Sequence, residues 1–348
     1  MVPALAIADV LAERGYEVHF CGGETGMEKA LVTRAGYPFS LVRIRGFKRR
    51  LGRDTLTTLA SIPRAGVDAW RLLRRLRPVC VVGVGAYASG PVVAEAAVAG
   101  IPALAVEMDA HLGWTNRILS LLVDKVCLSF SVEGRTGGKY LHTGRPIRPR
   151  LLTATKEEGV ARFGLDPGIP VVLVFGGSLG ARTLNDTTLG AFARVETPFS
   201  IIHITGERDF PRVSQELAQP GGNARYQAHA YLDDFPLALA ATTVAVSRAG
   251  GSVAELLARG VPALLVPFPL ATADHQTKNA LALQAAGAAV MVPDGELDAT
   301  RMKAELAGLL QPQTLQRMRR AALALARPDA ATRIADEIVE LAGPRRAT

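Results

Sequence analysis

GPVVAEAAVAGIPALAV, residues Gly90 to Val106, recurs later in the chain as GGSVAELLARGVPALLV, residues Gly250 to Val266. The identical positions are, in order, Gly, Val, Ala, Glu, Gly, Pro, Ala, Leu and Val. Each copy predicts a helix that stops at a Gly-x-Pro sequence and is followed by a strand. The period is too long for a solenoid, so the repeat indicates two domains of the same architecture. A shared way of packing a helix on a strand explains the glycine and proline, but not the matching glutamates Glu95 and Glu255.

The rest of the chain shows the same alternation of strand-like runs, rich in Val, Leu and Ile, with helical patterns. This alternation predicts an α/β fold of βαβ units, with parallel sheets covered by helices on both faces. In such sheets ligands bind beyond the carboxyl ends of the strands, and two facing sheets make a cleft. The predicted strands are Glu17 to Cys21, Val79 to Val84, Ala103 to Glu107, Val171 to Phe175, Ser200 to Thr205, Val244 to Ser247 and Ala263 to Pro267.

The length of the chain and its prolines predict the domain boundaries. At 348 residues the chain exceeds the limit of about 250 to 300 residues for a single core. The two prolines of Gly144 to Pro149 predict a boundary there. We therefore expect an amino-terminal domain at residues 1–145, a carboxyl-terminal domain at residues 146–325, and a last helix at residues 326–348 that packs back on the first domain.

The composition excludes several classes of protein. Apolar residues make up 49% and charged residues 21%, which is typical of a compact folded chain. No apolar run reaches the 18 or so residues that span a bilayer, and the first residues lack the pattern of a signal peptide, so we expect a cytoplasmic protein. Cys21, Cys80 and Cys127 lie far apart in strand-like runs, which favours buried thiols over a disulfide or zinc site. The net charge of +8 favours anionic partners.

The strongest motif is VVLVFGGSLGAR, residues Val171 to Arg182, a buried strand that ends in a Gly-rich turn before a helix. Glycines let the backbone approach an anion, and a helix start offers free N–H groups with roughly half a positive charge, so a pyrophosphate fits there. Ser178 adds a hydroxyl donor. The motif is neither a P-loop nor a strict G-x-G-x-x-G, which disfavours ATP hydrolysis and dinucleotide binding. The alternative interpretation is a tight turn with an N-cap serine.

Two further strand-to-helix junctions carry polar residues. In Ser247 to Glu255 a Gly-rich turn precedes Glu255, whose carboxylate can accept hydrogen bonds from both hydroxyls of a ribose. The alternative is a glutamate that only complements the helix dipole. In Pro267 to Ala280, Asp274 can cap a helix, and several polar groups at one strand end suit sugar hydroxyls, although a lone histidine is usually structural. The polar residues at the start of that helix are His275, Gln276 and Asn279.

In order and spacing these motifs resemble the MurG-type family of UDP-N-acetylglucosamine:N-acetylmuramyl-(pentapeptide) pyrophosphoryl-undecaprenol N-acetylglucosaminyltransferases, which is glycosyltransferase family 28. The resemblance spans nearly the whole chain. In the carboxyl half it rests on GGSLGARTLN at Gly176 to Asn185, Leu232-Asp233-Asp234, Arg-Ala-Gly before Glu255, and DHQTKNA at Asp274 to Ala280. In the amino half it rests on PALA at Pro3 to Ala6, the Gly83 to Pro91 segment, and Glu107 to Asn116.

The resemblance implies a GT-B fold, that is, two Rossmann-like doubly wound domains that face a cleft. It also implies an inverting, metal-independent transfer of GlcNAc from UDP-GlcNAc to the muramyl 4-hydroxyl of lipid I, which gives lipid II for peptidoglycan and cell wall biogenesis. No cofactor is implied. The leaving diphosphate would be neutralised by a helix start and cations, and the attacking hydroxyl needs a general base. The implied partners are UDP-GlcNAc, undecaprenyl-linked lipid I and an anionic membrane surface, with the enzyme peripheral on the inner face of the cell membrane.

The same resemblance implies roles for single residues. Ser178 would contact the diphosphate, Arg148 the nucleotide, and the backbone around Leu232 the uracil. Glu255 would bind the ribose, and Gln276 with its neighbour would bind the GlcNAc hydroxyls. The residues implied to bind or line the donor site are Asp109, Asn116, Arg148, Ser178, Leu232, Gly250, Gly251, Ser252, Glu255, His275, Gln276 and Asn279.

The chain departs from the family pattern in its amino half. The family shows His-Glu-Gln-Asn where this chain has Val106 to Asp109, so a carboxylate replaces an amide beside the donor sugar. The family's first Gly-rich turn, which ends in a histidine that serves the acceptor reaction, would lie before Met1. The chain opens with a helix where a βα unit begins with its strand, so we expect that the first strand of the amino-terminal domain is missing and that Met1 is not the natural start. The catalytic base is unassigned, with Glu107 and Asp109 as candidates.

Two basic stretches bear on the choice of partner. RIRGFKRRLGR at Arg43 to Arg53 and RLLRRLR at Arg71 to Arg77 mix basic with apolar residues, as expected of a surface that rests on anionic lipid. The alternative is a solvated helix face. Aromatic residues are scarce near these stretches, which disfavours RNA binding. Besides the lipid I transferase, the sequence allows a related enzyme that uses a UDP-sugar on another lipid or metabolite, and an inactive donor-binding homologue.

Overall fold

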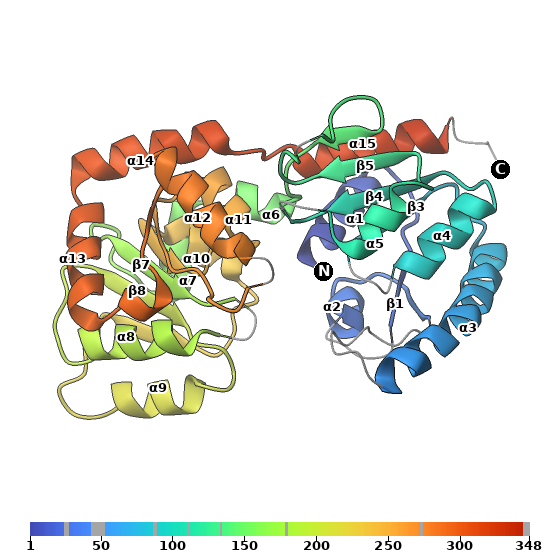
Figure 1. Ribbon diagram of the computed structural model, residues 1–348. Coiled ribbons are helices and arrows are strands. Elements are labelled where there is room, and N and C mark those ends of the chain that lie inside the picture. The colour runs from blue at the N-terminus through green and yellow to red at the C-terminus, as the bar shows by residue number, and fades with distance from the viewer. Residues whose placement is uncertain are drawn as a thin grey trace. The chain divides into compact units, whose positions relative to one another are not determined.

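The computed structural model describes residues 1–23, 28–42, 53–85, 89–109, 112–132, 134–177, 180–271 and 274–343, with the side chains of residues 28 and 53–63 excepted. The chain divides into two compact units (Figure 1). Unit 1 consists of Met1–Pro149 together with Arg327–Thr348, and unit 2 consists of Arg150–Ala326. Unit 1 is therefore built from two separate stretches of sequence, whereas unit 2 is one uninterrupted stretch.

The described strands of unit 1 form two parallel sheets. In the smaller one, β1 (Phe20–Gly22) pairs with β2 (Phe39–Leu41). The larger sheet has the order β3-β4-β5-β6. Every residue of β4 is buried, as is typical of a parallel strand with helices on both faces. The strands of the larger sheet are β3 (Val81–Val84), β4 (Ala103–Glu107), β5 (Lys125–Leu128) and β6 (Tyr140–His142).

Helices cover both faces of this larger sheet, because alternate residues of each strand point to opposite sides. On one face, α1 and α15 pack together, and Ile7 and Ile334 belong to the same apolar cluster as Leu104. On the other face, Val93 of α4 packs in a cluster with Ala105. The helices of unit 1 are α1 (Val2–Glu13), α2 (Glu28–Arg34), α3 (Arg53–Leu76), α4 (Gly90–Val98), α5 (Trp114–Leu119) and α15 (Ala330–Ala342).

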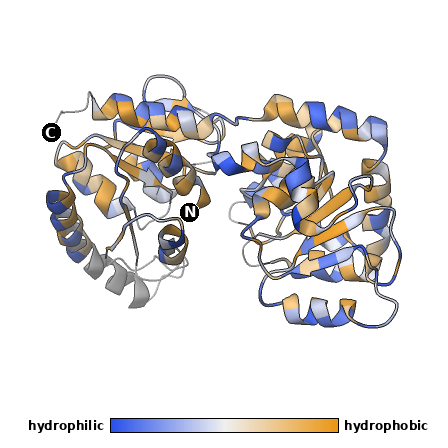
Figure 2. Cartoon of the chain, turned by 180° about the vertical axis from the view of Figure 1, so that it is seen from behind, coloured by the Kyte–Doolittle hydropathy of each residue, from blue (hydrophilic) through white to orange (hydrophobic). Residues whose placement is uncertain are grey.

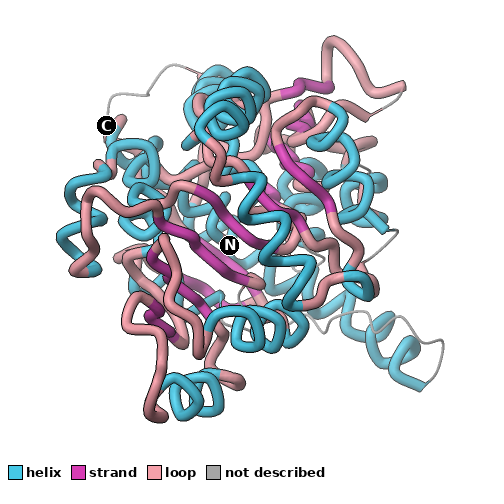
Figure 3. Tube along the Cα trace, turned by 90° about the vertical axis from the view of Figure 1, so that its left-hand side faces the viewer, coloured by secondary structure: helices cyan, strands magenta, loops and turns pink. Residues whose placement is uncertain are grey.

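Unit 2 has a single parallel sheet with the order β12-β11-β10-β7-β8-β9. This is a doubly wound, Rossmann-like order, in which the direction of winding reverses between β7 and β10. Figure 3 shows helices around these strands. The strands are β7 (Val171–Phe175), β8 (Ser200–Ile204), β9 (Tyr226–His229), β10 (Val244–Ser247), β11 (Ala263–Leu265) and β12 (Ala289–Met291).

The helices of unit 2 connect these strands and bury one face each. In Figure 2 the strands are mostly coloured as hydrophobic while the helices carry both colours, since only one side of each helix meets the core. No helix in the described part of the chain is long and apolar enough to cross a membrane. The helices are α6 (Pro149–Thr153), α7 (Lys156–Phe163), α8 (Arg182–Phe192), α9 (Phe210–Leu217), α10 (Phe235–Ala241), α11 (Val253–Arg259), α12 (His275–Ala285), the 3₁₀-helix η2 (Asp294–Glu296), α13 (Ala299–Leu309) and α14 (Pro312–Leu325).

The internal repeat is a helix followed by a strand in both units: α4 and β4 in one copy, α11 and β11 in the other. Each strand lies parallel to the strand before it in the chain. Gly100 and Gly260 end the two helices with φ of 71° and 62°, a left-handed conformation that costs glycine little. The predicted strand at Glu17 to Cys21 differs most from the structure, because β1 begins only at Phe20, where pairing with β2 starts.

Candidate functional site

The reversal between β7 and β10 places two Gly-rich turns at the carboxyl edge of the sheet of unit 2. In the first turn Gly176 has no room for a side chain, because a Cβ there would lie 2.4 Å from the Cβ of Ala181. Gly177 and Gly180 have φ of 97° and 75°. The chain therefore folds tightly onto the start of α8, where backbone N–H groups lack helical partners. Ser178 lies outside the described residues.

The second turn lies against the polar start of α12. A Cβ at Gly250 would lie 3.7 Å from Nε2 of Gln276. Oε1 of Gln276 accepts a hydrogen bond from the N–H of Phe268 at 3.0 Å, and Nδ2 of Asn279 donates to the carbonyl of Ala249 at 3.3 Å. The structure thus brings together three of the residues that the sequence analysis placed at the donor: Gly250, Gln276 and Asn279.

The other polar residues of these junctions lie at helix starts. Ser252 is the N-cap residue of α11, and Glu255 lies in the first turn of that helix. Asp274 is the N-cap residue of α12, and His275 is the first residue of that helix. The prediction that Asp274 caps the helix is right in position but wrong in contact, because its carboxylate makes no cap bond to the backbone and accepts from Oγ1 of Thr277 at 2.6 Å.

Arg248 is a buried charge that the sequence analysis did not include among the site residues. Its Nη1 donates to the carbonyls of Val266 and Pro267, both at 3.1 Å, and to the carboxylate of Asp294. Asp294 also accepts from Oγ1 of Thr183 in the first turn of α8, at 3.1 Å. These bonds join the ends of β10 and β11 to the start of α8. The signal in the sequence is an arginine that directly follows a fully buried strand.

Leu232 lies further along the same edge of the sheet, in the connection between β9 and α10, and it is buried. Two strands, β7 and β8, separate β9 from β10. Strands lie about 4.8 Å apart, so the ends of β9 and β10 are separated by roughly 14 Å. The candidate residues of unit 2 therefore line an extended edge, which suits a long ligand made of several parts.

In unit 1, Glu107 is the last residue of β4 and is only 4% exposed. Its Oε1 accepts from the N–H groups of Met108 (2.9 Å) and Asp109 (3.1 Å). Its Oε2 accepts from the N–H of Gly113 (2.9 Å) and from Nδ2 of Asn116 (3.0 Å). Four donors match the acceptor capacity of one carboxylate. Glu107 therefore anchors the loop that leads to α5, and the buried Asn116 is part of this anchor, while Asp109 is exposed.

Arg148 also has a partner within unit 1. Its Nε donates to Oδ2 of Asp9 on α1 at 2.9 Å, and Oδ1 of Asp9 accepts from the hydroxyl of Tyr37 at 2.9 Å. Burial, and then the hydrogen bond with Asp9, raise the pKa of Tyr37 to about 12. The Arg148 side chain is still 42% exposed, so this contact ties the Gly144–Pro149 segment to α1 without enclosing the guanidinium.

A hollow, the placement of possible metal ligands and a buried thiol complete the description of the polar groups in the described residues. A hollow of about 420 Å³ is lined by Arg182, Asp186 and Arg212 in unit 2. No group of three or more His, Cys, Asp or Glu side chains within the described ranges is placed to hold a metal ion. Burial raises the pKa of the Cys127 thiol to about 12, so this thiol is protonated at neutral pH.

Comparison with protein families gives a match in each half of the chain. The family model described as the glycosyltransferase family 28 N-terminal domain matches residues 1–128. The model described as the glycosyltransferase family 28 C-terminal domain matches residues 171–334. Together the two models cover most of the chain.

Similar curated proteins include two transferases described as UDP-N-acetylglucosamine--N-acetylmuramyl-(pentapeptide) pyrophosphoryl-undecaprenol N-acetylglucosamine transferase. The one from Halothermothrix orenii is 36% identical over 307 residues, which is 85% of this chain and 83% of the relative. The one from Stutzerimonas stutzeri is 36% identical over 344 residues, which is 98% of this chain and 95% of the relative.

Comparison with solved structures also finds glycosyltransferases. The crystal structure of MurG from Acinetobacter baumannii has a TM-score of 0.74 and 28% identity, and the match covers 97% of this chain and 94% of that one. The calicheamicin glycosyltransferase CalG4 has a TM-score of 0.67 at 17% identity, covering 97% and 94%, which is a likeness of fold. The expected GT-B fold is thereby confirmed. The chain therefore belongs to glycosyltransferase family 28 and is a hexosyltransferase.

Proposed function

We propose that the chain transfers N-acetylglucosamine from UDP-N-acetylglucosamine to the 4-hydroxyl of the muramyl sugar of lipid I, forming lipid II. The observation that carries this proposal is the polar edge at the switch point of unit 2, where a Gly-rich turn and the contacts among Gly250, Gln276 and Asn279 meet. The names of the two similar transferases contain this donor and this acceptor.

The diphosphate of the donor is proposed to bind at the first turn. The described residues of this turn, Gly176, Gly177 and Gly180–Arg182, lie at the positive end of α8, where free backbone N–H groups favour an anion. Ser178 would add a hydroxyl donor. Arg248 and Asp294 support this place, because they connect the start of α8 to the ends of β10 and β11. An anion held in this way needs no bound metal to neutralise it as it leaves.

The remaining parts of the donor are assigned to residues of unit 2, with the exception of Arg148, which belongs to unit 1. The backbone around Leu232 is proposed to bind the uracil, and the exposed part of Arg148 the nucleotide. Glu255 would accept from the ribose hydroxyls. The groups proposed for the phosphate and the GlcNAc hydroxyls are Gly250, Gly251, Ser252, His275, Gln276 and Asn279. The span of roughly 14 Å from the end of β9 to the end of β10 matches an extended nucleotide-sugar.

The chemical step is proposed to be a single displacement that inverts the anomeric carbon. The muramyl hydroxyl loses its proton to a general base as it attacks. Of the two candidate carboxylates, Glu107 already accepts four N–H bonds, so it is better suited to shaping the loop. Asp109 is exposed and its backbone is fixed by Glu107, and we propose it as the base.

Peripheral association with an anionic membrane is proposed for unit 1. α3 packs on α4 and α4 packs on α5, and each of these helices exposes large apolar side chains. Val98 on α4 is 77% exposed and Trp114 on α5 is 81% exposed. Basic residues of the Arg71 to Arg77 stretch lie on α3, where Arg74 stacks over Trp70 at 5.0 Å. Residues 43–52 of the other basic stretch lie outside the described residues.

The test is a transfer assay with radiolabelled UDP-GlcNAc and lipid I in detergent, with EDTA present. We expect labelled lipid II with an inverted, β-configured linkage, and no requirement for added divalent metal. Donor binding without transfer to lipid I would contradict the proposal and favour an inactive homologue. Transfer to a different lipid or metabolite, but not to lipid I, would favour a related UDP-sugar transferase.

A further inference from the structure

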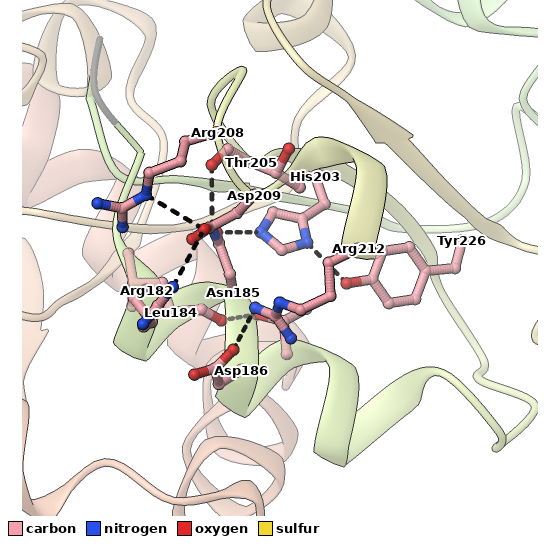
Figure 4. Close-up of polar contacts among 11 residues, drawn as sticks. Arg182, Leu184, Asn185, Asp186, His203, Thr205, Arg208, Asp209, Arg212 and Tyr226 are labelled. Atoms are coloured by element: carbon pink, nitrogen blue, oxygen red, sulfur yellow. Dashed lines mark hydrogen bonds and ion pairs between the residues drawn. The ribbon is translucent and has the colours of Figure 1, made fainter. Parts of the chain in front are cut away.

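Four polar side chains are buried between the sheet of unit 2 and helices α8 and α9. They are Asn185 on α8, His203 on β8, Asp209 at the start of α9, and Tyr226 on β9. Asn185 and His203 have no exposed surface, Asp209 is 5% exposed and Tyr226 is 6% exposed. Figure 4 shows His203 between Asn185 and Tyr226, with Asp209 close to Asn185. Buried polar groups are costly unless they are fully paired, so this cluster calls for an explanation.

The contacts of the cluster determine which atom donates and which atom accepts in each hydrogen bond. Nδ2 of Asn185 donates to the carbonyl of Thr205 and to Oδ2 of Asp209, both at 2.9 Å. Its Oδ1 is therefore the acceptor that faces Nε2 of His203 at 2.9 Å, and this nitrogen carries the proton. Nδ1 of His203 then accepts from the hydroxyl of Tyr226 at 2.7 Å. Burial lowers the pKa of His203 to about 3, so the ring is neutral at physiological pH.

Asp209 supplies a fixed negative charge at one end of the cluster. Burial works to raise its pKa, but the hydrogen bond from Asn185 and the charges of Arg208 and Arg182 outweigh this effect and lower it. Both arginine side chains are largely exposed, and their nitrogens lie 3.4 Å and 3.9 Å from Oδ1 of Asp209. Asn185 thus lies between an anion and a neutral ring, an arrangement that holds its amide in one orientation.

The amide of Asn185 is connected to the first Gly-rich turn by the carbonyl group of Thr205. A Cβ at Gly180 would lie 2.3 Å from the carbonyl oxygen of Thr205, so the backbone of the turn rests directly on that oxygen. The same oxygen accepts from Nδ2 of Asn185. The N–H of Asn185 donates to Ala181, and the N–H of Gly180 donates to Gly177, within the turn itself. Asn185 therefore contacts the turn from two sides.

We propose that Asn185, oriented by His203 and Tyr226, is a positioning residue for the end of the anion-binding turn, at Gly180 and Ala181. It fixes the Thr205 carbonyl against Gly180 and so holds the backbone N–H groups of the turn in the shape that receives the donor diphosphate. None of the three side chains touches the donor. This inference rests on the proposed function, since it concerns the site where the diphosphate is assigned.

The test is the substitution Asn185→Asp, which keeps the shape of the side chain and makes its orientation depend on pH. When it is protonated, the new carboxyl group can still donate one hydrogen bond to Thr205 or Asp209. When it is ionised, it is repelled by both, so it withdraws from the Thr205 carbonyl. We expect UDP-GlcNAc to bind about as well as to the unsubstituted chain near pH 5.5, and at least about tenfold more weakly near pH 8. Both phosphates of this donor are esterified, so the donor does not itself titrate between these values.

The matched control is Thr188→Val, one turn further along α8. Thr188 is also fully buried, but its hydroxyl donates to the carbonyl of Leu184 at 2.6 Å, within the helix. This variant should lose some stability and keep the affinity for UDP-GlcNAc at both pH values. Tyr226→Phe is a milder variant in case Asn185→Asp does not fold. It frees His203 to change tautomer, and we expect a severalfold loss of affinity with no new pH dependence.

Amide hydrogen exchange without ligand separates this inference from the proposed function. We expect the segment from Gly176 to Asn185 to exchange faster in Asn185→Asp than in Thr188→Val, compared at the same pH. Faster exchange in a chain that does not bind UDP-GlcNAc would contradict the proposed function alone. Equal exchange, or a donor affinity of Asn185→Asp that does not change with pH while the unsubstituted chain binds, would overturn the positioning role.

Discussion

Each unit contains a buried charge at the carboxyl end of a strand, and the two charges are held in opposite ways. Among the residues that the structure describes, Glu107 accepts only from groups within nine residues of it. Arg248 donates to carbonyls 18 and 19 residues away and to Asp294, 46 residues away. An anion at a strand end can be satisfied by the N–H groups of its own loop, whereas a cation needs carbonyls from neighbouring strand ends. The anion therefore shapes one loop, and the cation joins several.

The largest loss of stability is expected from Arg248→Met, which removes the hydrogen bonds between Arg248 and residues distant in the sequence. Methionine keeps much of the apolar stem but removes the donor of two carbonyls and the positive partner of Asp294, which keeps the hydrogen bond from Thr183. Unit 2 should lose about 3 to 5 kcal/mol of stability and its affinity for UDP-GlcNAc. Both tryptophans, Trp70 and Trp114, belong to unit 1. Urea unfolding should therefore shift when followed by circular dichroism and remain unchanged when followed by tryptophan fluorescence.

Two controls isolate the buried pair. Arg301→Met removes an i,i+4 ion pair with Glu305 on α13, where the arginine side chain is 51% exposed, and should cost at most about 0.5 kcal/mol. The double variant Arg248→Met with Asp294→Asn should recover part of the lost stability, because the carboxylate that lost its positive partner is then removed. If it is no more stable than Arg248→Met, the unpaired charge is not the cause of the loss.

Acid should sharpen the difference between the units. Burial lowers the pKa of His203 to about 3, and burial with the charge of Arg162 lowers that of His229. The unfolded chain then binds more protons than the folded one below about pH 6.5, so the stabilisation is complete above that pH and is lost as the pH falls. For His203 alone the loss is about 1.4 kcal/mol per pH unit, or about 2 kcal/mol at pH 5. His203→Gln should flatten the pH dependence of the circular dichroism transition, and an unchanged slope would contradict the assignment.

Glu107→Gln tests the local arrangement in unit 1. The amide keeps the shape but turns an N–H₂ group toward backbone N–H donors, and we expect a loss of about 1 to 2 kcal/mol. Trp114 directly follows Gly113, so its fluorescence should report the loosened loop. Calorimetry should show unchanged UDP-GlcNAc affinity, while turnover falls because Asp109 is no longer held. A weakened donor affinity with normal turnover would reverse these roles.

The smallest loss of stability is expected from a glycine substitution in each of the two copies of the repeat. At Gly100 an added methyl group would meet only open space, so Gly100→Ala should cost only the left-handed strain, about 1 kcal/mol. At Gly260 a Cβ would also lie 2.8 Å from Cγ of Leu323 and 3.1 Å from Cγ of Arg319 on α14. Gly260→Ala should therefore cost roughly 1 kcal/mol more. Equal losses of unfolding free energy in the two variants, each measured on its own unit, would show that α14 moves aside at no cost.

Local patterns predicted the elements of the fold well. The run Ala103 to Glu107 matched β4 at both ends, and Gly100 and Gly260 ended their helices as expected, because burial on both faces and left-handed glycines depend on nearby residues. The order of the six strands of unit 2 depends on pairing between distant segments, and no local pattern contains that information.

The candidate site was predictable only in part, for the same reason. The approach of Gln276 to Gly250 follows from parallel strands that end at one edge, so motif positions suffice. Arg248 and His203 look like isolated polar residues in apolar runs, and their partners Asp294 and Asn185 are found only once helices pack on the sheet. The sequence singled out Glu107 as a candidate base, but its four N–H donors are found only once the loop has closed.

The return of the chain from unit 2 into unit 1 has a consequence for synthesis on the ribosome. All of unit 2 is synthesised before residue 327, so α15 is made only after the whole of unit 2. Until then α1 lacks the partner that covers Ile7, and Ile334 is not yet available. Synthesis proceeds at about 5 to 20 residues per second, so the residues of unit 2 delay the meeting of α1 and α15 by roughly 10 to 35 seconds. During this delay the apolar face of α1 that packs against α15 is without that partner.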